Sequence, residues 1–456
     1  MNKPDPSSPI DKTPLSLRLR AIGPRVFDLL IAGSLALLAL PLWLAAGLMW
    51  AARLIVWTRT ERLGEAGEKF HQFTWCWRRQ PEKPCPVIGQ LPTLLNVLGG
   101  SMAIVGPRAV SPGDPLLELT DSVWRFGVKP GLVCLWWIRQ RANIDYGSEV
   151  DADYEYVATH GLKRDIGISL RALAALILGR AHPQTTDELQ LLGLRIDNFT
   201  MQRTLDEIVR MANGTEPAQV CFLNADCVNI AWQNADYRET LRHARCTLAD
   251  GVGLKLAGRL LGREIRQNVN GTDLFPRLCE TISGTPLSIY LLGARPGVVE
   301  AVAEWVTRHY PDVRMAGGRH GYFTPQEEPE VVREIAESGA SILMVAFGAP
   351  RQDLWIRQHL AATGVRVAMG VGGLFDFYSG RIPRAPQWMR ELCLEWLYRV
   401  CVEPRRLWRR YLVGNVVFLW RAGMERLFGP PAWAATPRGR QASAEDAIVP
   451  RRRPVE

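Results

Sequence analysis

Two polar residues, Asn224 and Asp250, each follow a short apolar run and precede a helical pattern. The run 220–223 ends at Asn224, and the run 246–249 ends at Asp250. This strand, helix, strand, helix order predicts parallel strands, whose carboxyl ends share one edge of a sheet. We therefore expect both side chains at one ligand crevice, where a carboxylate can serve as a general base. Asp-Gly before a helix also forms an ordinary turn and N-cap, so this pair alone leaves both interpretations open.

Three more strand ends carry small and polar residues, and the pattern places them at the same edge. Their loops follow the apolar runs 287–292, 341–347 and 365–371 and are rich in glycine. Glycines let backbone N–H groups approach a diphosphate, and the amino ends of helices favour negative charge. The loops therefore predict a nucleotide site. Its expected binding residues are Gly251, Gly293, Gly348, Gly372, Gly373 and Asp376.

Short apolar strands alternate with amphipathic helices over residues 192–427. This order predicts an α/β domain with a Rossmann-like parallel sheet that helices cover on both faces. Its last part, residues 384–427, reads as a basic helical appendage rich in arginine and tryptophan. The polar residues 181–191 predict a linker, and residues 428–456, rich in Pro, Ala and Arg, predict a disordered tail.

Residues 29–52 are an uncharged apolar run that is long enough to cross a bilayer. Pro41 lies near its middle and predicts a kink. Basic residues stand on both sides, which allows both ends to remain on the cytoplasmic side. These features favour a re-entrant hairpin over about residues 26–55, although a straight single span fits the residues nearly as well. The Pro/Ser-rich residues 1–20 predict a disordered arm.

Composition narrows the class of protein. A chain of 456 residues is long enough for at least two domains. Its nine cysteines are odd in number and form no CxxC pair, which argues against a disulfide framework or a zinc ribbon and fits a reducing compartment. The net charge of +9, together with 16 tryptophans, indicates contact with phosphates or an anionic membrane surface. No nucleic-acid reader motif is present, so we expect no nucleic-acid partner.

Residues 21–180 resemble the bacterial sugar transferases, which are monotopic polyprenyl-phosphate phosphoglycosyl transferases. That family has an Asp-Glu dyad just before a Leu-Pro pair, and this chain has Gly89-Gln90 there. Neither residue can be a carboxylate nucleophile or a hard-cation ligand of the required charge. The resemblance therefore predicts a membrane-associated, α-rich domain that keeps the fold without its chemistry. The blocks that carry the resemblance are Arg25-Val26-Phe27-Asp28, Leu91-Pro92, Leu95-Asn96-Val97-Leu98 and Val105-Gly106-Pro107-Arg108.

Residues 193–411 are similar to the WecG/TagA/CpsF glycosyltransferases. The resemblance implies inverting transfer of a sugar from a nucleotide-sugar donor, with UDP as the expected nucleotide, to a polyprenyl-diphosphate-linked saccharide. It implies no cofactor and no required metal. The product would belong to surface polysaccharide synthesis. The blocks that carry the resemblance are LNAD, LADGVGL, NGTDLF, LLGARPG, AFGAPRQDLWI, GVGGLFDFYSGRIPRAPQWM and LEWLYRVCVEPRRLWRRY.

The same resemblance assigns roles to individual residues. Asp250 matches the family's proposed base, Asn224 the polar residue that faces it, and Gln352 the polar residue of the Gly-x-Pro-x-Gln block. The appendage is expected to close over the site, where Arg384, Arg399 and Arg406 would neutralise the leaving diphosphate. Two positions depart from the pattern. Phe222 stands where the family often has Thr, and Asn268 where Arg is common, with Arg266 as a candidate for the missing charge.

We therefore expect a glycosyltransferase at the cytoplasmic face of the bacterial inner membrane, with self-association as a further expectation. Three alternatives remain. A bifunctional enzyme that also primes polyprenyl phosphate is opposed by Gly89-Gln90. A non-catalytic membrane scaffold is opposed by Asp250, Asn224 and Gln352. A dinucleotide oxidoreductase is opposed by the lack of a GxGxxG turn with an acidic residue at the right distance.

Overall fold

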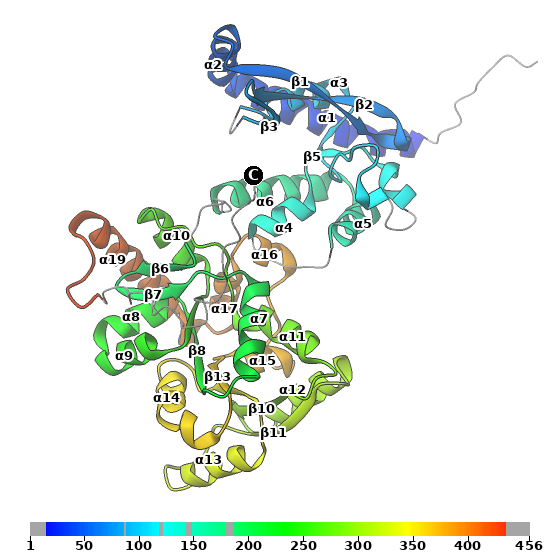
Figure 1. The fold of residues 1–456 in the computed structure, drawn as a ribbon. Coiled ribbons are helices and arrows are strands. Elements are labelled where there is room, and N and C mark those ends of the chain that lie inside the picture. Colours follow the sequence, from blue (N-terminus) through cyan, green and yellow to red (C-terminus); the bar gives the residue numbers. More distant parts are fainter. Residues whose placement is uncertain (1–14, 86–87, 118–121, 143–147, 179–185, 435–456) are drawn as a thin grey trace, which may run out of the picture. The chain divides into compact units, whose positions relative to one another are not determined.

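The computed structural model describes residues 15–85, 88–117, 122–142, 148–178 and 186–434, and Figure 1 labels their elements. The chain forms two compact units. The N-terminal unit comprises residues up to 180 together with 386–395, and the C-terminal unit comprises residues 181–385 and those from 396 onward.

The apolar N-terminal run forms two helices, α1 (Leu15–Leu38) and α2 (Leu40–Ala51), which are bent by 62° at Ala39. Pro41 lies in the first turn of α2, where its missing N–H costs no helical hydrogen bond, so the predicted kink is confirmed. Within the described residues no single helix has the length and hydropathy to cross a membrane, whereas this bent pair together does. Residues 15–20, predicted as part of a disordered arm, instead begin α1, because leucine and arginine favour helix. Residues 1–14 lie outside the described part.

The rest of the N-terminal unit contains a sheet that the sequence did not predict. Strands β1 (Ile55–Leu63), β2 (Lys69–Trp77) and β3 (Gln80–Pro84) pair antiparallel in that order. Because only Ile55 of β1 is buried, this strand shows no apolar alternation to recognise. The remaining α-helices and strands are α3 (Thr93–Gly99), the parallel pair β4 (Ala103–Val105) and β5 (Gly131–Val133), α4 (Leu135–Ala142), α5 (Glu149–Thr159), α6 (Leu162–Leu178) and α16 (Gln387–Glu391).

The C-terminal unit is built on a six-stranded sheet in the order β11-β10-β12-β13-β8-β9. Every pairing is parallel, so the predicted parallel sheet is confirmed. The strands are β8 (Ala218–Leu223), β9 (Cys246–Ala249), β10 (Ser288–Gly293), β11 (Arg314–Arg319), β12 (Ile342–Ala346) and β13 (Val367–Gly370).

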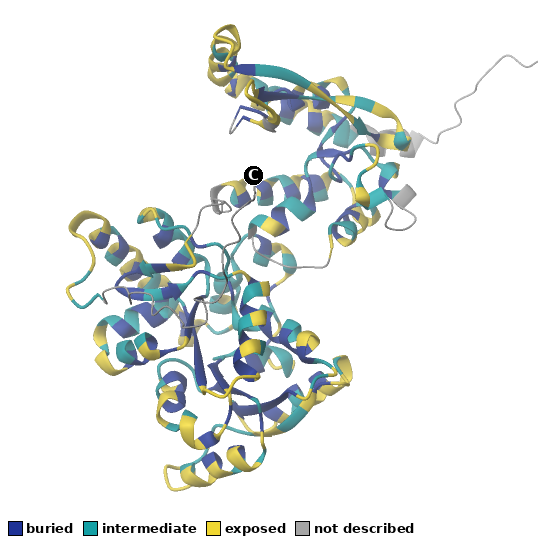
Figure 2. Cartoon of the chain, viewed as in Figure 1, coloured by how far each residue is buried: buried dark blue, intermediate teal, exposed yellow. Residues whose placement is uncertain are grey.

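Helices cover both faces of this sheet. Successive strand residues point to opposite sides, so a strand made of apolar residues presents an apolar surface on each face. In β8, Val220 and Phe222 pack on one face, and Cys221 and Leu223 on the other. The central strands are buried throughout, as Figure 2 shows. One face carries α7 (Met201–Ala212), α11 (Gly271–Ile282), α12 (Val298–His309) and α15 (Leu374–Tyr378). The other carries α8 (Ala225–Gln233), α9 (Ala235–His243), α10 (Val252–Leu260), α13 (Glu328–Glu337) and α14 (Arg351–Thr363).

Two segments predicted to lack structure are ordered. Residues 188–191, predicted as linker, form β6 (Glu188–Leu191) and pair with β7 (Leu194–Asp197), because alternate leucines bury on one side. Trp433, predicted to lie in the disordered tail, packs its ring against Trp232, with the ring centroids 5.4 Å apart. Residues 435–456 lie outside the described part.

The appendage within the C-terminal unit consists of α17 (Glu395–Val402), α18 (Pro404–Trp408), a single π-helical turn η4 (Arg409–Val413) and α19 (Gly414–Phe428). Phe418 and Ala422 of α19 are buried in the core beside α8 and α10. Asn229 of α8 donates to the Gly414 carbonyl at 2.8 Å and accepts from Arg421 at 2.6 Å. These contacts fix α19, and the π turn that precedes it, against α8.

Candidate functional site

Four neighbouring strands bring most of the predicted site residues to one edge of the sheet. In the order β12-β13-β8-β9, the loops after these strands carry Gly348, Gly372 with Gly373, Asn224 and Asp250. Parallel strands are spaced by about 4.8 Å, so these loops span roughly 14 Å. That width matches a bound nucleotide sugar in scale, and the predicted common edge is confirmed.

The turn at Asp250 is joined to β8 and to the chain before α11. The Asp250 N–H donates to the Leu223 carbonyl at 2.8 Å, and the Gly251 N–H donates to the side-chain oxygen of Asn268. Asn224 caps α8 by accepting from the Cys227 N–H at 3.0 Å. The plain N-cap interpretation therefore holds for Asn224 alongside any role at the site.

The sequence suggested that Arg266 could supply the charge of the arginine that the family commonly has at position 268. The structure gives Asn268 and Arg266 other roles. Asn268 supports the Asp250-Gly251 turn through the hydrogen bond to Gly251. Arg266 donates to Asp187 at 2.7 Å, and Asp187 also pairs with Arg203. An arginine at position 268 is thus replaced by an amide that accepts from the backbone, and the charge of Arg266 is directed to Asp187.

Gln352 ties two of the glycine loops together. Its side-chain oxygen accepts from the Gly348 N–H at 3.0 Å and from the Gly372 N–H at 2.9 Å. The side chain is buried at 6% exposure, in the first turn of α14. These contacts make Gln352 a clamp that sets the spacing of the loops after β12 and β13, and its direct part in the reaction stays a prediction.

A buried carboxyl group, Asp353, lies next to this clamp. It accepts from the Tyr237 hydroxyl at 3.2 Å, and its backbone carbonyl accepts from Gln219 at 2.9 Å. Burial raises the pKa of Asp353 from its ordinary 3.8 to about 7, and hydrogen bonds from Tyr237, Cys221 and Gln352 offset only part of that effect. No sequence pattern singles out this residue, because one acidic residue in a helix's first turn is common.

The backbone donors expected to bind a diphosphate are already used within the protein. The N–H groups of Gly348 and Gly372 donate to Gln352, and that of Gly251 donates to Asn268. Gly293 has a packing role: with φ of 125°, a β-carbon there would stand 2.8 Å from the Ala346 backbone. These glycines therefore serve the structure of the loops, and their role in binding a diphosphate stays a prediction.

The three predicted arginines have different surroundings. Arg399 lies against the loop after β13, with one guanidinium nitrogen 3.0 Å from where a β-carbon of Gly373 would stand, and its guanidinium covers the Phe377 ring at 5.2 Å. Arg384 forms an ion pair with Asp273, at the start of α11. Arg406 is 63% exposed and pairs with Glu403, three residues earlier. Of the three, the geometry favours Arg399 as a ligand for a diphosphate.

Asp376, predicted as a binding residue, lies after the same loop, in α15. Its carboxylate accepts from Arg381 at 2.7 Å. Its backbone carbonyl accepts from the Ile382 N–H at 2.9 Å. Asp376 thus shapes the chain that leaves α15 for the appendage.

Arg410, on the π turn, is a further residue of this site. Its Nε lies 3.0 Å from the Asp226 carboxylate, which stands two residues after Asn224. Burial lowers the pKa of Arg410, but nearby Tyr411, Asp226, Cys227 and Asp250 outweigh it and raise that pKa overall. Because four arginines occur within residues 405–410, no sequence signal could select this one.

The N-terminal unit has no room for the family's nucleophile at its usual position. A β-carbon on Gly89 would stand 2.4 Å from the Cys85 carbonyl oxygen and 2.7 Å from the Cys85 nitrogen. The Gly89 N–H also donates to that carbonyl at 2.9 Å. Gln90 is exposed and accepts from the Thr93 hydroxyl at 3.0 Å. The backbone has closed where an aspartate side chain would begin.

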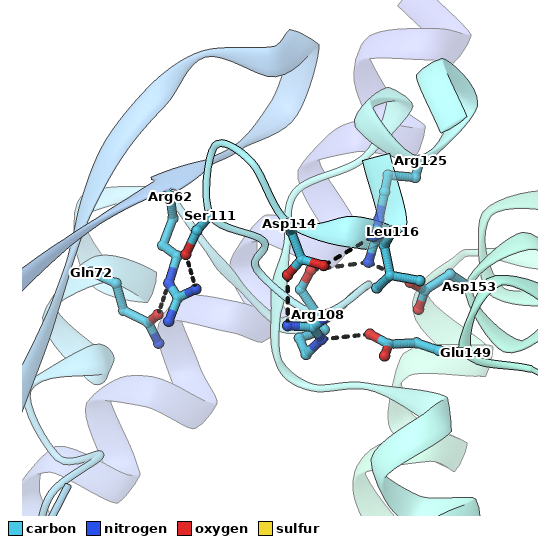
Figure 3. A network of polar contacts seen from close by, with 9 residues as sticks. All are labelled: Arg62, Gln72, Arg108, Ser111, Asp114, Leu116, Arg125, Glu149 and Asp153. Carbon is cyan, nitrogen blue, oxygen red and sulfur yellow. Dashed lines mark hydrogen bonds and ion pairs between the residues drawn. The ribbon is translucent and has the colours of Figure 1, made fainter. Parts of the chain in front are cut away.

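The arginine of the Gly-Pro-Arg block in this unit is bound by acidic side chains (Figure 3). Arg108 donates to Glu149 at 2.5 Å and to Asp114 at 3.2 Å. Arg125 donates to the buried Asp153 at 2.5 Å and to the Arg108 carbonyl at 3.2 Å. Arg108 and Arg125 are thus each paired with a carboxylate within the protein, which fits a structural use of the family's residues.

Comparison with known proteins bears on both units. Residues 189–431 match the glycosyl transferase WecG/TagA/CpsF family, and residues 87–179 match the bacterial sugar transferase family. The N-acetylglucosaminyldiphosphoundecaprenol N-acetyl-beta-D-mannosaminyltransferase of Bacillus subtilis (strain 168) is 32% identical over 195 residues, which cover 43% of this chain and 75% of that protein. The protein of the same name from Bacillus spizizenii is 35% identical over 182 residues, covering 40% and 70%. Both resemblances seen in the sequence are confirmed.

The position of Arg410 predicts that its charge matters more than that of its neighbours. In Arg410→Met we expect kcat for sugar transfer to fall about 100-fold, because a cation beside the reacting groups is lost. Arg405→Met, an exposed change on the adjacent helix, is the control and should lower kcat less than about threefold. Arg406→Met in the same assay tests the role assigned from sequence. Equal losses in the Arg405 and Arg410 variants would contradict the assignment.

Asp353 predicts a pH dependence of stability. Its folded-state pKa of about 7 exceeds the ordinary 3.8, so folding favours the neutral acid, and this contribution is lost as pH rises through 7. Asp353→Asn stays neutral, so its stability relative to the wild type should increase by about 2 kcal/mol between pH 5 and pH 8. Thermal unfolding at both pH values measures this, with the exposed Asp312→Asn as control. A pH-independent difference would show that Asp353 does not titrate in this range.

Proposed function

Because the chain belongs to the glycosyl transferase WecG/TagA/CpsF family, and is thus a glycosyltransferase, we propose that it extends a polyprenyl-diphosphate-linked saccharide. The donor is a nucleotide diphosphate sugar of the N-acetylhexosamine type, with UDP-N-acetylmannosamine as the first candidate. The acceptor is N-acetylglucosaminyl-diphosphoundecaprenol, the lipid in the names of both Bacillus relatives.

The observation that carries the proposal is the set of groups around one edge of the parallel sheet. A carboxylate, Asp250, lies directly after β9, while the loops after β12 and β13 are held at fixed spacing by Gln352. Two arginines of the appendage, Arg399 and Arg410, stand beside these loops. A carboxylate that can accept a proton and cations that can offset phosphate charge are the groups that a single displacement at an anomeric carbon requires.

In the proposed reaction, Asp250 accepts the proton of the acceptor hydroxyl as its oxygen attacks the anomeric carbon. The bond to the nucleotide diphosphate breaks on the opposite face, which inverts the configuration. Arg399 and Arg410 counter the negative charge that grows on the departing diphosphate. The step requires neither a covalent intermediate nor a metal ion, since arginine side chains supply the positive charge.

We further propose that the N-terminal unit is an anchor without phosphoglycosyl transferase activity. Gly89 and Gln90 offer no carboxylate, and the backbone at Gly89 leaves no space for one. The bent pair α1 and α2 exposes large apolar side chains, including Leu38, Leu44 and Leu48 at 79%, 70% and 74%. Such a surface is suited to the acyl region of a bilayer and would hold the protein at the leaflet that carries its lipid acceptor.

A transfer assay in nanodiscs tests the activity. Radiolabelled UDP-sugars would be offered with polyprenyl phosphate or with N-acetylglucosaminyl-diphosphoundecaprenol. We expect label only on the sugar-bearing lipid, and at least about 100-fold slower transfer by Asp250→Asn, because the general base is lost. Asp312→Asn, an exposed aspartate of the same unit, is the matched control. Label on bare polyprenyl phosphate would refute the inactive anchor, and an undiminished Asp250 variant would refute the assigned base.

Vesicle flotation tests the anchor. The double variant Leu38→Glu/Leu48→Glu should leave the membrane fraction, since each charge in the bilayer core costs about 3 kcal/mol. Tyr322→Ser, a change at an exposed aromatic residue of the other unit, should float like the wild type. In spheroplasts, an epitope ahead of α1 should resist external protease. Cleavage there would favour a single span over a re-entrant pair.

A further inference from the structure

A short segment of the appendage belongs to the N-terminal unit. Residues 386–395 are part of that unit, whereas the chain before and after them is part of the C-terminal unit. The segment contains the helix α16, which packs against α4 and α6. The chain therefore leaves the glycosyltransferase unit for ten residues in the middle of the region that carries the site's arginines.

One carboxylate holds this segment. The Glu391 side chain is fully buried, and its two oxygens accept from different arginines: Oε1 from Arg139 of α4 at 3.2 Å, and Oε2 from Arg171 of α6. Arg139 is 2% exposed and also pairs with Glu155 of α5 at 2.5 Å. Glu155 in turn pairs with Arg164 of α6. Arginine and glutamate thus alternate through the helices of the N-terminal unit and end on α16.

Buried charges of this kind are sensitive to the loss of one partner. Removing the Glu391 carboxylate leaves Arg171 without this acceptor and leaves Arg139 with one carboxylate fewer in a site that excludes water. Such uncompensated burial is strongly unfavourable, so the pairing gives the segment a defined position that packing of a five-residue helix alone would not.

The segment is flanked by residues of the site. Arg384, two residues before the segment, forms an ion pair with Asp273, and Arg399, four residues after it, lies against Gly373. A chain of four residues spans at most about 14 Å, so the position of Glu395 restricts where Arg399 can reach. The segment is therefore connected to both arginines by short stretches of chain.

We propose that the surface formed by α4 and α6 is a docking site for residues 386–395, and that Glu391 is a positioning residue for Arg384 and Arg399. The sugar-transferase-like unit thereby has a second use: it holds the glycosyltransferase's own appendage in the conformation that transfer requires. The kinetic part of this proposal rests on the proposed function, and the docking part does not.

The test uses the full chain in nanodiscs and compares the wild type with Glu391→Gln. Hydrogen exchange is measured in peptides covering 386–394 and 396–403. We expect exchange to be at least about tenfold faster in both peptides, since a lost buried ion pair frees the segment and α17 with it. We also expect kcat to fall about tenfold with a smaller change in the KM for the nucleotide sugar, because Arg399 acts on the departing charge.

Controls separate positioning from general damage. Glu304→Gln removes a surface-exposed pair with Arg308 and should change neither exchange nor kcat. Arg171→Met is the second variant, and the double variant should be no worse than Glu391→Gln alone, because the pair that Arg171→Met removes is one of the two that Glu391→Gln already disrupts. Unchanged thermal unfolding of the C-terminal unit would confirm that it remains folded.

The outcomes are distinct. Exchange in 386–394 at the wild-type rate in both Glu391→Gln and Arg171→Met would overturn the docking site. Faster exchange in 386–394 with no change in 396–403 or in kcat would overturn the positioning role. If the wild type transfers no sugar to any lipid acceptor, the proposed function fails, and exchange in 396–403 still decides whether Glu391 positions α17.

Discussion

All strands of the C-terminal sheet run in the same direction, and the site depends on that constraint. A parallel ladder sends every carboxyl end to one edge, so residues far apart in the chain, such as Asn224 and Gly372, become neighbours. Fine positioning then comes from side chains that link the loops. Gln352 joins the loops after β12 and β13, and Asn268 supports the turn after β9. The sheet sets the site's location, and these amides set its dimensions.

Using backbone donors for structure has a chemical consequence. The N–H groups of Gly251, Gly348 and Gly372 are satisfied within the protein, so they stabilise loops and contribute little charge to a leaving diphosphate. In the proposed reaction, arginines from the appendage supply it instead. A guanidinium offers several N–H donors in one plane and stays charged at any physiological pH, which suits a reaction in which negative charge develops on phosphate oxygens.

The N-terminal unit resembles the bacterial sugar transferases but lacks their Asp-Glu dyad. Gly89 packs directly on the Cys85 backbone, and Arg108 is bound by Glu149 and Asp114, so the place of the family's dyad is filled and the arginine of the Gly-Pro-Arg block is paired. The unit retains a bent apolar helix pair and an ionic network that ends on α16. In the proposed function, the helix pair holds the protein at a membrane, and the ionic network holds a segment of the chain.

The sequence predicted the parallel sheet, the edge that carries the site residues, and the family. Apolar periodicity and local turn chemistry determine the first two, and the motif blocks indicate the third. They missed β1 to β3, in which few residues are buried apart from Ile55 and the end of β2, and they missed Asp353, whose pKa depends on burial beside β8 and α9. Arg410 shows the limit most clearly. On a regular helix Arg406 and Arg410, four residues apart, would share a face. Here Arg406 is 63% exposed and pairs with Glu403, whereas Arg410, at the start of the π turn, reaches Asp226 of α8. The partner of Arg410 lies far away in the chain, so spacing alone does not tell which of the two arginines enters the site.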